Sequence, residues 1–308
     1  MAAMTELSCF VVSDGRRGIE NQALGLAEAV GRVRPVRILP IHLDKGGDPP
    51  DPGPIAPDLW IGCGRAAVKA APGFRRAHPK AVMVYVQDPR AHHEVFDLIV
   101  PPRHDRLTGR SVFPILGSPN RIHAERLEEA RETFAAELAR LPSPRAAFLI
   151  GGDSKHHRFS REACDYVQGR IEQVRQMGLS LMITTSRRTP PSLTATLADR
   201  YGDADDVWLH RGDGPNPYFA FLAGADFIFV TEDSTNMLTE AAATGRPVFK
   251  LGVDGSPGKF RHLYAGLEGH GALRPWLGAL QRWTYPPLNE TDRAAARLVE
   301  ILPQNTEL

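Results

Sequence analysis

The stretch VTEDSTNMLTEAAATGRPVF (Val230–Phe249) combines acidic, hydroxyl and amide side chains with a helix-forming segment. Asp233 or Ser234 can cap the helix that this segment predicts. The free amides and positive dipole end of such a helix would bind a phosphate. Glu240 shares a helix face with Asp233 and would accept hydrogen bonds from ribose hydroxyls, because a carboxylate offers only acceptors. The alternative interpretation is a structural helix with a cap and a polar face.

Basic residues in the second half of the chain support a phosphate ligand, because each falls at or near the predicted end of a strand. Arginine binds phosphate as a planar fork and lysine binds it as a point charge. Each one alone is typical of a solvated surface charge, whereas their convergence on one sheet edge favours binding. The residues predicted to bind the ligand are Gly151, Gly152, Lys155, Ser186, Arg187, Arg188, Arg211, Thr231, Glu232, Asp233, Ser234, Asn236 and Glu240, with Lys250 nearby.

A second stretch, SDGRRGIENQALGLAEAV (Ser13–Val30), follows the first predicted strand. It lacks the G-x-G-x-x-G spacing of dinucleotide-binding folds, and the second strand ends in Leu39-Pro40 rather than in an acid, which disfavours a dehydrogenase. Glu20 has two interpretations. It is either a first-turn acid that favours the helix dipole or a general base whose pKa is raised by burial.

These stretches are positioned by short strands that alternate with helices, which implies βαβ crossovers and parallel sheets with ligands beyond the carboxyl ends of the strands. The predicted helices include 20–30, 66–71 and a long one over 122–141. The predicted strands are 9–12, 36–39, 59–61, 82–86, 98–100, 112–115, 146–150, 181–184, 207–209, 227–230 and 248–251.

The segment LPSPR (Leu141–Arg145) places two prolines in three residues and predicts a linker. The fold class expected is therefore α/β, with two Rossmann-like domains facing a cleft. The first domain would span 1–141 and the second 145–288. The remaining segment, 289–308, predicts a helix that could pack on either domain, including back on the first.

Composition narrows the class of protein. The chain has 308 residues, which suits two domains of ~150 residues. Its net charge of +1 points to neither nucleic acid nor an anionic membrane as a partner. The three cysteines form no C-x-x-C pair and the paired histidines are adjacent, so no metal site is predicted. Without a signal peptide or an apolar run of ~18 residues, a cytoplasmic protein is expected.

Three stretches together resemble a known family: DGRRGIENQALGLAEA, TSRRTP and VTEDSTNMLTEAAATGRPVF. They are similar to the plant mitochondrial-fission factor, the elongated-mitochondria protein, and its bacterial relatives. The resemblance covers nearly the whole chain, and its G-x-E-N-Q (Gly18–Gln22) and T-E-D-S (Thr231–Ser234) signatures are specific in combination. It implies the GT-B architecture of glycosyltransferases, in which the second domain binds the nucleotide-sugar. The composition, without a eukaryotic targeting segment, favours a bacterial source.

The resemblance implies less than an assigned reaction. The function that we expect is a metal-independent transfer of sugar from a nucleotide-sugar to a hydroxyl of an envelope or lipid-linked glycan. Basic side chains would neutralise the leaving group in place of a metal, and no cofactor is expected beyond the nucleotide-sugar co-substrate. A peripheral contact with the inner membrane is left open. Glu20 is the preferred base and Asp14 the reserve. The residues expected on the acceptor side are Arg16, Gly18, Asn21, Gln22, Asp88 and His92.

Two other functions remain open at this point. A nucleotide-sugar epimerase or hydrolase would use the same fold and donor pocket, and would turn over without an acceptor. A non-catalytic interaction protein, as the plant family member's association with a dynamin-like protein suggests, would bind no nucleotide.

Overall fold

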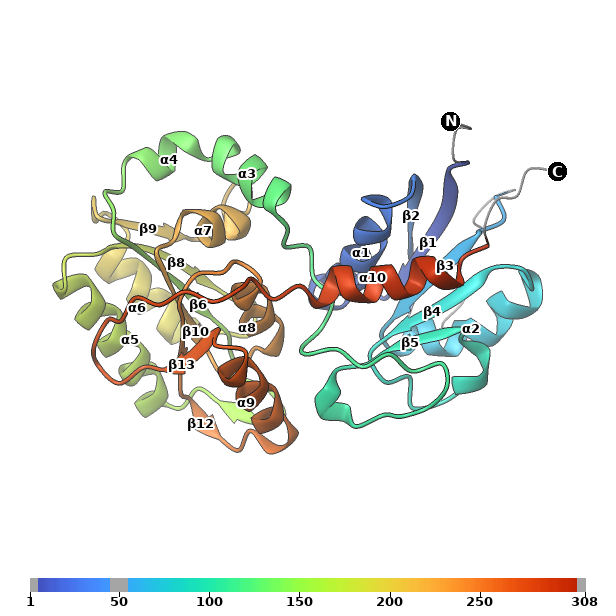
Figure 1. Ribbon diagram of the computed structural model, residues 1–308. Helices are drawn as coiled ribbons and strands as arrows, with labels where there is room; N and C mark the ends of the chain where they lie inside the picture. The colour runs from blue at the N-terminus through green and yellow to red at the C-terminus, as the bar shows by residue number, and fades with distance from the viewer. Residues whose placement is uncertain (1–4, 45–54, 304–308) are drawn as a thin grey trace. The chain divides into compact units, whose positions relative to one another are not determined.

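The computed structural model describes residues 5–44 and 55–303 (Figure 1). The chain forms two compact units. Unit 1 comprises Met1–Arg121 and Asn289–Leu308, and unit 2 comprises Ile122–Leu288. Each unit has its own parallel sheet.

Unit 1 is a five-stranded parallel sheet in the order β2-β1-β3-β4-β5. Alternate strand residues supply two cores, one on each face of the sheet, because successive side chains point to opposite faces. Cys9, Val11 and Ile61 belong to one core, and Phe10 and Trp60 to the other. The strands are β1 (Leu7–Ser13), β2 (Val36–His42), β3 (Leu59–Cys63), β4 (Val82–Val86) and β5 (Leu98–Val100).

Helix α2 (Arg65–Ala77) covers the face that carries Trp60, and α1 (Arg17–Gly31) and α10 (Glu290–Ile301) cover the other. Two short 3₁₀ turns, His93–Val95 and Arg103–Asp105, flank β5.

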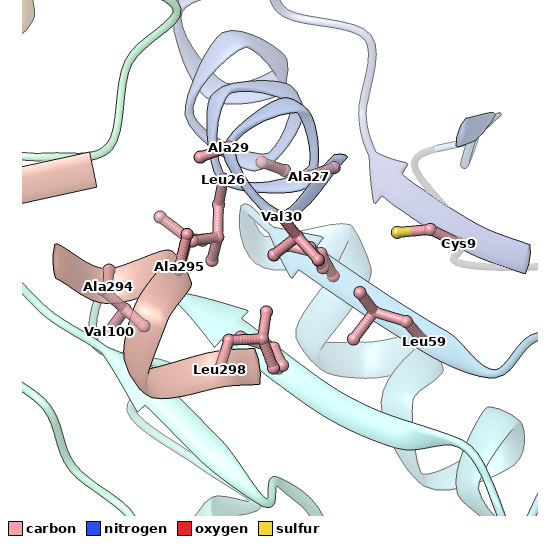
Figure 2. Close-up of a cluster of buried hydrophobic side chains, with 14 of the residues drawn as sticks. Cys9, Leu26, Ala27, Ala29, Val30, Leu59, Val100, Ala294, Ala295 and Leu298 are labelled. Carbon is pink, nitrogen blue, oxygen red and sulfur yellow. The ribbon is translucent and has the colours of Figure 1, made fainter. Parts of the chain in front are cut away.

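Helix α10 comes from the far end of the sequence and completes the core of unit 1 (Figures 1 and 2). Its fully buried Leu298 packs with Leu26 and Val30 of α1, and Ala294 and Ala295 lie in the same cluster. Small residues on both helices allow this close contact. The described part of the 289–308 segment, up to residue 303, therefore belongs to the core of unit 1.

Unit 2 has a six-stranded parallel sheet in the order β13-β11-β10-β6-β8-β9. Helices α5 and α6 cover one face, where Val167, Ile171 and Leu197 pack on Phe148. The strands are β6 (Arg145–Ile150), β8 (Ser180–Thr185), β9 (Val207–His210), β10 (Phe227–Thr231), β11 (Val248–Leu251) and β13 (Leu273–Pro275), with a small antiparallel ribbon of β7 (His157–Arg158) and β12 (Asp254–Gly255).

The helices of unit 2 are α3 (Ala124–Thr133), α4 (Ala135–Ala139), α5 (Arg161–Gln176), α6 (Pro191–Tyr201), α7 (Tyr218–Gly224), α8 (Thr235–Ala242) and α9 (Arg261–Gly269), with a 3₁₀ turn at Gly258–Phe260.

The structure differs from the sequence prediction at three places. The helix predicted over 122–141 is two helices that meet at Phe134, and it lies in unit 2 rather than unit 1. There α3 packs on α7, and Arg131 donates a hydrogen bond of 2.9 Å to the Ala223 carbonyl. The segment 112–115 forms two isolated bridges instead of a strand. Strand β13 was not predicted, because its short sequence Leu-Arg-Pro carries no alternating pattern.

Candidate functional site

The loops after β6 and β10 meet at the point where the order of strand addition in the sheet of unit 2 reverses. From β6 the chain builds β8 and β9 on one side, and it then builds β10, β11 and β13 on the other. Ligands of open α/β sheets bind at such switch points. Here the Gly151 amide donates to the Thr231 hydroxyl at 2.7 Å, and the Gly152 amide donates to Asp233 Oδ2 at 2.9 Å. The structure thus brings the predicted GG and TED segments together.

Asp233 holds these two loops to a third. Its side chain has no exposed surface, and it accepts hydrogen bonds from the Thr231 hydroxyl (2.8 Å) and from Arg188 Nη2 (3.0 Å) as well as from Gly152. Burial raises the pKa of Asp233, and the hydrogen bonds from Gly152, Thr231 and Arg188 act in the opposite direction. Asp233 is therefore placed to organise the loops rather than to touch a ligand.

Gly151 and Gly152 are required by the closeness of this packing. A Cβ at Gly151 would lie 2.1 Å from Asp233 Oδ2, and a Cβ at Gly152 would lie 2.0 Å from the Arg188 carbonyl carbon. Either substitution would separate the loops.

Arg188 and Arg187 are neighbours with different surroundings. The Arg188 guanidinium donates to the carbonyls of Gly152 (2.8 Å) and Asp153 (2.6 Å), and its backbone amide donates to Ser186 Oγ (3.1 Å). Arg187 and Lys155 are both exposed, and within the described part of the chain neither makes a hydrogen bond or ion pair. These two cations are available to bind an anion, whereas the Arg188 guanidinium is occupied by hydrogen bonds that hold the loops together.

Helix α8 begins at the same network. Ser234, rather than Asp233, is its N-cap, and the Ser234 hydroxyl accepts a hydrogen bond from the Met237 amide. Asn236 lies in the first turn of this helix. The positive end of the α8 dipole therefore lies beside the exit of β10.

Replacing Ser234 by alanine is expected to lower the free energy of unfolding by about 1 kcal/mol, because the helix loses the acceptor for one of its first amides. Chemical denaturation of the variant measures this. Ser234→Asn should retain most of the stability because asparagine also caps helices. A full loss in Ser234→Asn would contradict a capping role.

Glu232, the residue before Asp233, forms an ion pair with Lys250. Glu232 Oε2 accepts from Lys250 Nζ at 3.0 Å, and Oε1 accepts from the Val253 amide at 3.2 Å. The Tyr264 ring lies 4.4 Å from Lys250 Nζ, and its hydroxyl donates to the Glu232 carbonyl at 2.6 Å. Glu232 thus fixes β10 to β11.

Glu240 is half-buried on α8, and its Oε2 accepts a hydrogen bond of 2.5 Å from the Tyr218 hydroxyl at the start of α7. Burial raises the pKa of Glu240 to about 7, although the bond from Tyr218 opposes the shift. The charge of this carboxyl therefore changes near neutral pH. Tyr218 was not predicted from the sequence as a site residue, because no local spacing connects the start of α7 with α8.

The structure does not bring Arg211 to this network. Its Nη2 lies 3.8 Å from Asp203 Oδ1, and a Cβ at Gly202 would touch it at 1.9 Å. Gly202 follows the end of α6, whereas Arg187 and Arg188 precede its start, and a helix of 11 residues spans about 16 Å. The end of a predicted strand locates the backbone of a residue, but a long side chain such as that of Arg211 can point away from the sheet edge.

In unit 1 the corresponding switch point lies between β1 and β3. Asp14, after β1, forms a 2.7 Å ion pair with Arg16, and the Arg16 hydrogen bond lowers the pKa of Asp14. A carboxylate stabilised in this way is a weak proton acceptor. Asp14 and Arg16 are therefore better placed to hold one another than to act as base and acceptor contact.

Glu20, in the first turn of α1, makes a short hydrogen bond through Oε1 with Nε2 of His42. His42 is the last residue of β2. The strand predicted from the sequence ends at Leu39, so His42 was not among the predicted site residues. Three more strand residues place its side chain at the same sheet edge.

Gly18 and Gln22 contact each other within α1, and Asn21 lies between them on the same helix. Gln22 Nε2 donates to the Gly18 carbonyl at 2.9 Å, and Gln87 Nε2 donates to Gln22 Oε1 at 3.1 Å. Gln87 has a φ of 87°, a conformation that is strained for a residue with a side chain. These contacts tie the loop after β4 to α1.

Asp88 accepts from Arg90, at 2.9 Å from its amide and 3.0 Å from Nε, and lies 3.5 Å from His93 Nε2. His92 is exposed in a left-handed conformation with a φ of 56°, and its ring lies 3.8 Å from Glu94. His93, rather than the predicted His92, is thus the histidine beside Asp88.

Residues 5–44 and 55–303 contain no group of three or more His, Cys, Asp or Glu side chains that could hold a metal ion. Among the helices described in those ranges, none is both long enough and apolar enough to cross a membrane.

Comparison with known proteins gives the family. The family described as Mitochondrial fission ELM1 matches residues 17–302. The chain belongs to this family. The mitochondrial fission protein ELM1 of Arabidopsis thaliana is 30% identical over 269 residues, which are 79% of this chain and 63% of the Arabidopsis protein. An uncharacterized protein of Rickettsia prowazekii is 21% identical over 94% of this chain and 97% of its own length. The family resemblance in the sequence is confirmed.

Solved structures of low sequence identity share the fold of this ELM1-family chain. UDP-GlcNAc 2-epimerase of Methanocaldococcus jannaschii, in complex with UDP-GlcNAc and UDP, has a TM-score of 0.58 at 13% identity, covering 97% of this chain and 99% of that one. The Neisseria meningitidis enzyme bound to UDP-GlcNAc has a TM-score of 0.51 at 9% identity, covering 96% and 92%. The predicted α/β, GT-B-like fold is confirmed.

Proposed function

We propose that this ELM1-family chain is a glycosyltransferase that binds a nucleotide-sugar on unit 2 and transfers the sugar to a hydroxyl of a glycan or lipid-linked acceptor. The observation that carries the proposal is the switch point of unit 2. There the start of α8 lies on loops that Asp233 and Arg188 hold together. The same loops carry Arg187 and Lys155, two cations that make no hydrogen bond or ion pair among the residues that the structure describes.

The diphosphate would bind at the start of α8, where backbone amides and the helix dipole favour negative charge. Arg187 and Lys155 would neutralise the charge that develops on the leaving diphosphate. This places no metal or further cofactor in the proposed reaction. Glu240 would accept hydrogen bonds from the ribose, because Tyr218 occupies only its Oε2 atom.

The residues that we propose for the acceptor side belong to unit 1, with Asn21 on α1 and Asp88 in the loop after β4. The class of acceptor that we propose is an envelope or lipid-linked glycan.

A second function is favoured by the neighbouring structures, two of which are UDP-GlcNAc 2-epimerases with UDP-GlcNAc bound. An epimerase would convert the sugar of UDP-GlcNAc without an acceptor. Proton NMR of UDP-GlcNAc incubated with the protein alone would show a second UDP-sugar in that case. The proposed transferase gives none.

The proposal predicts binding of UDP and UDP-GlcNAc that calorimetric titration can measure, together with a panel of other nucleoside diphosphates. Arg187→Ala should weaken the affinity about tenfold, because a charge-assisted hydrogen bond to phosphate is lost. The matched control is Arg200→Ala, an equally exposed arginine near the end of α6, which should bind as the wild type does.

Absence of binding to every nucleotide by the folded wild-type protein would contradict the proposal. It would favour a non-catalytic interaction protein on the same fold. Equal losses in Arg187→Ala and Arg200→Ala would show that only overall charge matters and would contradict the assigned site.

A further inference from the structure

His157 is a buried histidine of unit 2 whose ring makes no hydrogen bond within the described chain. It is the first residue of β7 and is 1% exposed. Among residues 5–44 and 55–303, neither Nδ1 nor Nε2 of its ring has a hydrogen-bond partner. Buried polar groups are almost always hydrogen-bonded, because burial without a partner costs free energy. Both hydrogen-bonding atoms of this ring are therefore available to a ligand.

Two sets of contacts place His157 beside the switch point of unit 2. The loop that leads from β6 to His157 is bonded to the exit of β10, because its Gly152 amide donates to Asp233 Oδ2 at 2.9 Å. The strand that pairs with His157 is β12, which directly follows the backbone amide that donates to Glu232 Oε1 at 3.2 Å. His157 is thus joined from both sides to the acidic residues just before α8.

Charged groups on several elements act on the His157 ring. Burial lowers the pKa of His157, and the charges of His156 and of Lys250 on β11 act in the same direction. The charges of Glu232 and Asp233, after β10, act in the opposite direction. With a pKa below that of an ordinary histidine, the ring is neutral at pH 8. A neutral imidazole has one N–H donor and one acceptor nitrogen.

The turn that contains His157 also carries a cation. The Ser154 amide donates to the His157 carbonyl at 2.9 Å, and the His157 amide donates to Ser154 Oγ at 3.0 Å, so the two ends of residues 154–157 are tied together. Lys155 lies exposed on this turn. The turn therefore combines an outer cation with an inner hydrogen-bond donor, and both groups suit a phosphate.

We propose that His157 is a phosphate-binding residue of the donor site, and that an N–H of its ring donates a hydrogen bond to the diphosphate that Lys155 attracts. This inference rests on the proposed nucleotide-sugar site and uses residues of unit 2 alone. Since His157 is 1% exposed, we expect the turn 154–157 to shift when the diphosphate binds. The neutral donor would fix the position of the phosphate, whereas Lys155 and Arg187 would supply the charge.

Nitrogen-15 NMR of the histidine rings at pH 8 tests this contact directly. UDP-GlcNAc and inorganic pyrophosphate should each shift the ring signals of His157, which a sample of His157→Gln assigns. Uridine has no phosphate and should leave these signals unchanged. The matched control is His270, whose ring bonds to the Pro286 carbonyl at 2.8 Å and should respond to none of the three compounds.

Calorimetric titration of variants at pH 8 gives an independent measurement. His157→Ala should weaken the affinity for UDP-GlcNAc about tenfold, because a hydrogen bond to a charged oxygen is lost. His157→Gln keeps an N–H donor and should recover most of the affinity, which a merely structural role would not predict. Arg158→Ala is the control, since Arg158 is the exposed neighbour in the same strand, and it should bind as the wild type does.

The outcomes separate the inference from the proposed function. Wild-type protein that binds no nucleotide would overturn the proposed function and the role of His157 with it. If a nucleotide binds but the ring signals of His157 stay unchanged, only the role of His157 is overturned. The same conclusion would follow if uridine shifted the ring as far as pyrophosphate does, or if folded His157→Ala bound UDP-GlcNAc as tightly as wild type.

Discussion

Replacing Asp233 by alanine is expected to lower the free energy of unfolding by about 4 kcal/mol. The Arg188 side chain is 46% exposed, so its ion pair with Asp233 contributes little. Most of the cost comes from the buried donors that lose their acceptor, at about 1–3 kcal/mol each. Here the Gly152 amide, the Thr231 hydroxyl and the Arg188 guanidinium would all lose an acceptor. Denaturant unfolding followed by circular dichroism measures the change.

Two companion variants sharpen this result. Asp233→Asn keeps an oxygen for the Gly152 amide and should cost about half as much. Asp205→Ala removes an exposed carboxylate of unit 2 and should leave stability within about 0.5 kcal/mol. A small cost for Asp233→Ala would mean that the three loops are held by other contacts. If Asp233→Ala folds at low temperature, it should also bind UDP more weakly, since the loop of Arg187 loses its support.

The second large effect is expected at Glu240. The affinity of wild type for UDP-GlcNAc should rise about tenfold between pH 6 and pH 8, because the pKa of Glu240 is about 7 and only the carboxylate accepts from both ribose hydroxyls. UDP-GlcNAc is the preferred ligand for this titration, since both of its phosphates are esterified and carry constant charge over this range.

Glu240→Gln should abolish this pH dependence and should bind UDP-GlcNAc about 10- to 100-fold more weakly at pH 8. Burial lowers the pKa values of His157 and His210, so these histidines lose their charge at a lower pH than an ordinary histidine does. A pH dependence that persists in Glu240→Gln would assign it to another group. Tyr218→Phe is the matched variant that removes only the hydroxyl bonded to Glu240.

The same carboxyl should also affect stability, with the opposite sign from a paired surface acid. Its pKa in the folded protein lies above the ordinary value of 4.5, so the folded state holds a proton that the unfolded state has already lost. Stability should therefore fall as the pH rises from 4.5 to 7. Glu240→Gln should remove this part of the fall.

Local sequence patterns were sufficient for the strands and for the loops that leave them. Short apolar runs predicted ten of the parallel strands, although β2 was ended three residues early, and residue type limited the cap of α8 to Asp233 or Ser234. These features depend on neighbours in the sequence, where propensity and periodicity act directly.

What the patterns did not predict depends on contacts between distant segments. Tyr218 meets Glu240 across 22 positions, and His42 meets Glu20 across the same separation. Arg211 illustrates the converse, because its backbone lies at a strand end while its guanidinium lies by Gly202. Side chains with several rotatable bonds follow the packing of their surroundings, and a single sequence does not contain that packing explicitly.

The packing of Leu298 into unit 1 also bears on how the protein is made. A ribosome releases residues 122–288 as one continuous segment, so unit 2 has all its strands before the last helix is synthesised. Until α10 is synthesised, the core of unit 1 formed by the first 121 residues stays uncovered on the side where α10 packs. We expect a nascent chain stopped before Glu290 to contain a folded unit 2 and an incompletely folded unit 1 that proteases and chaperones can bind. Unit 1 is thus the first to begin synthesis and the last to complete its folding.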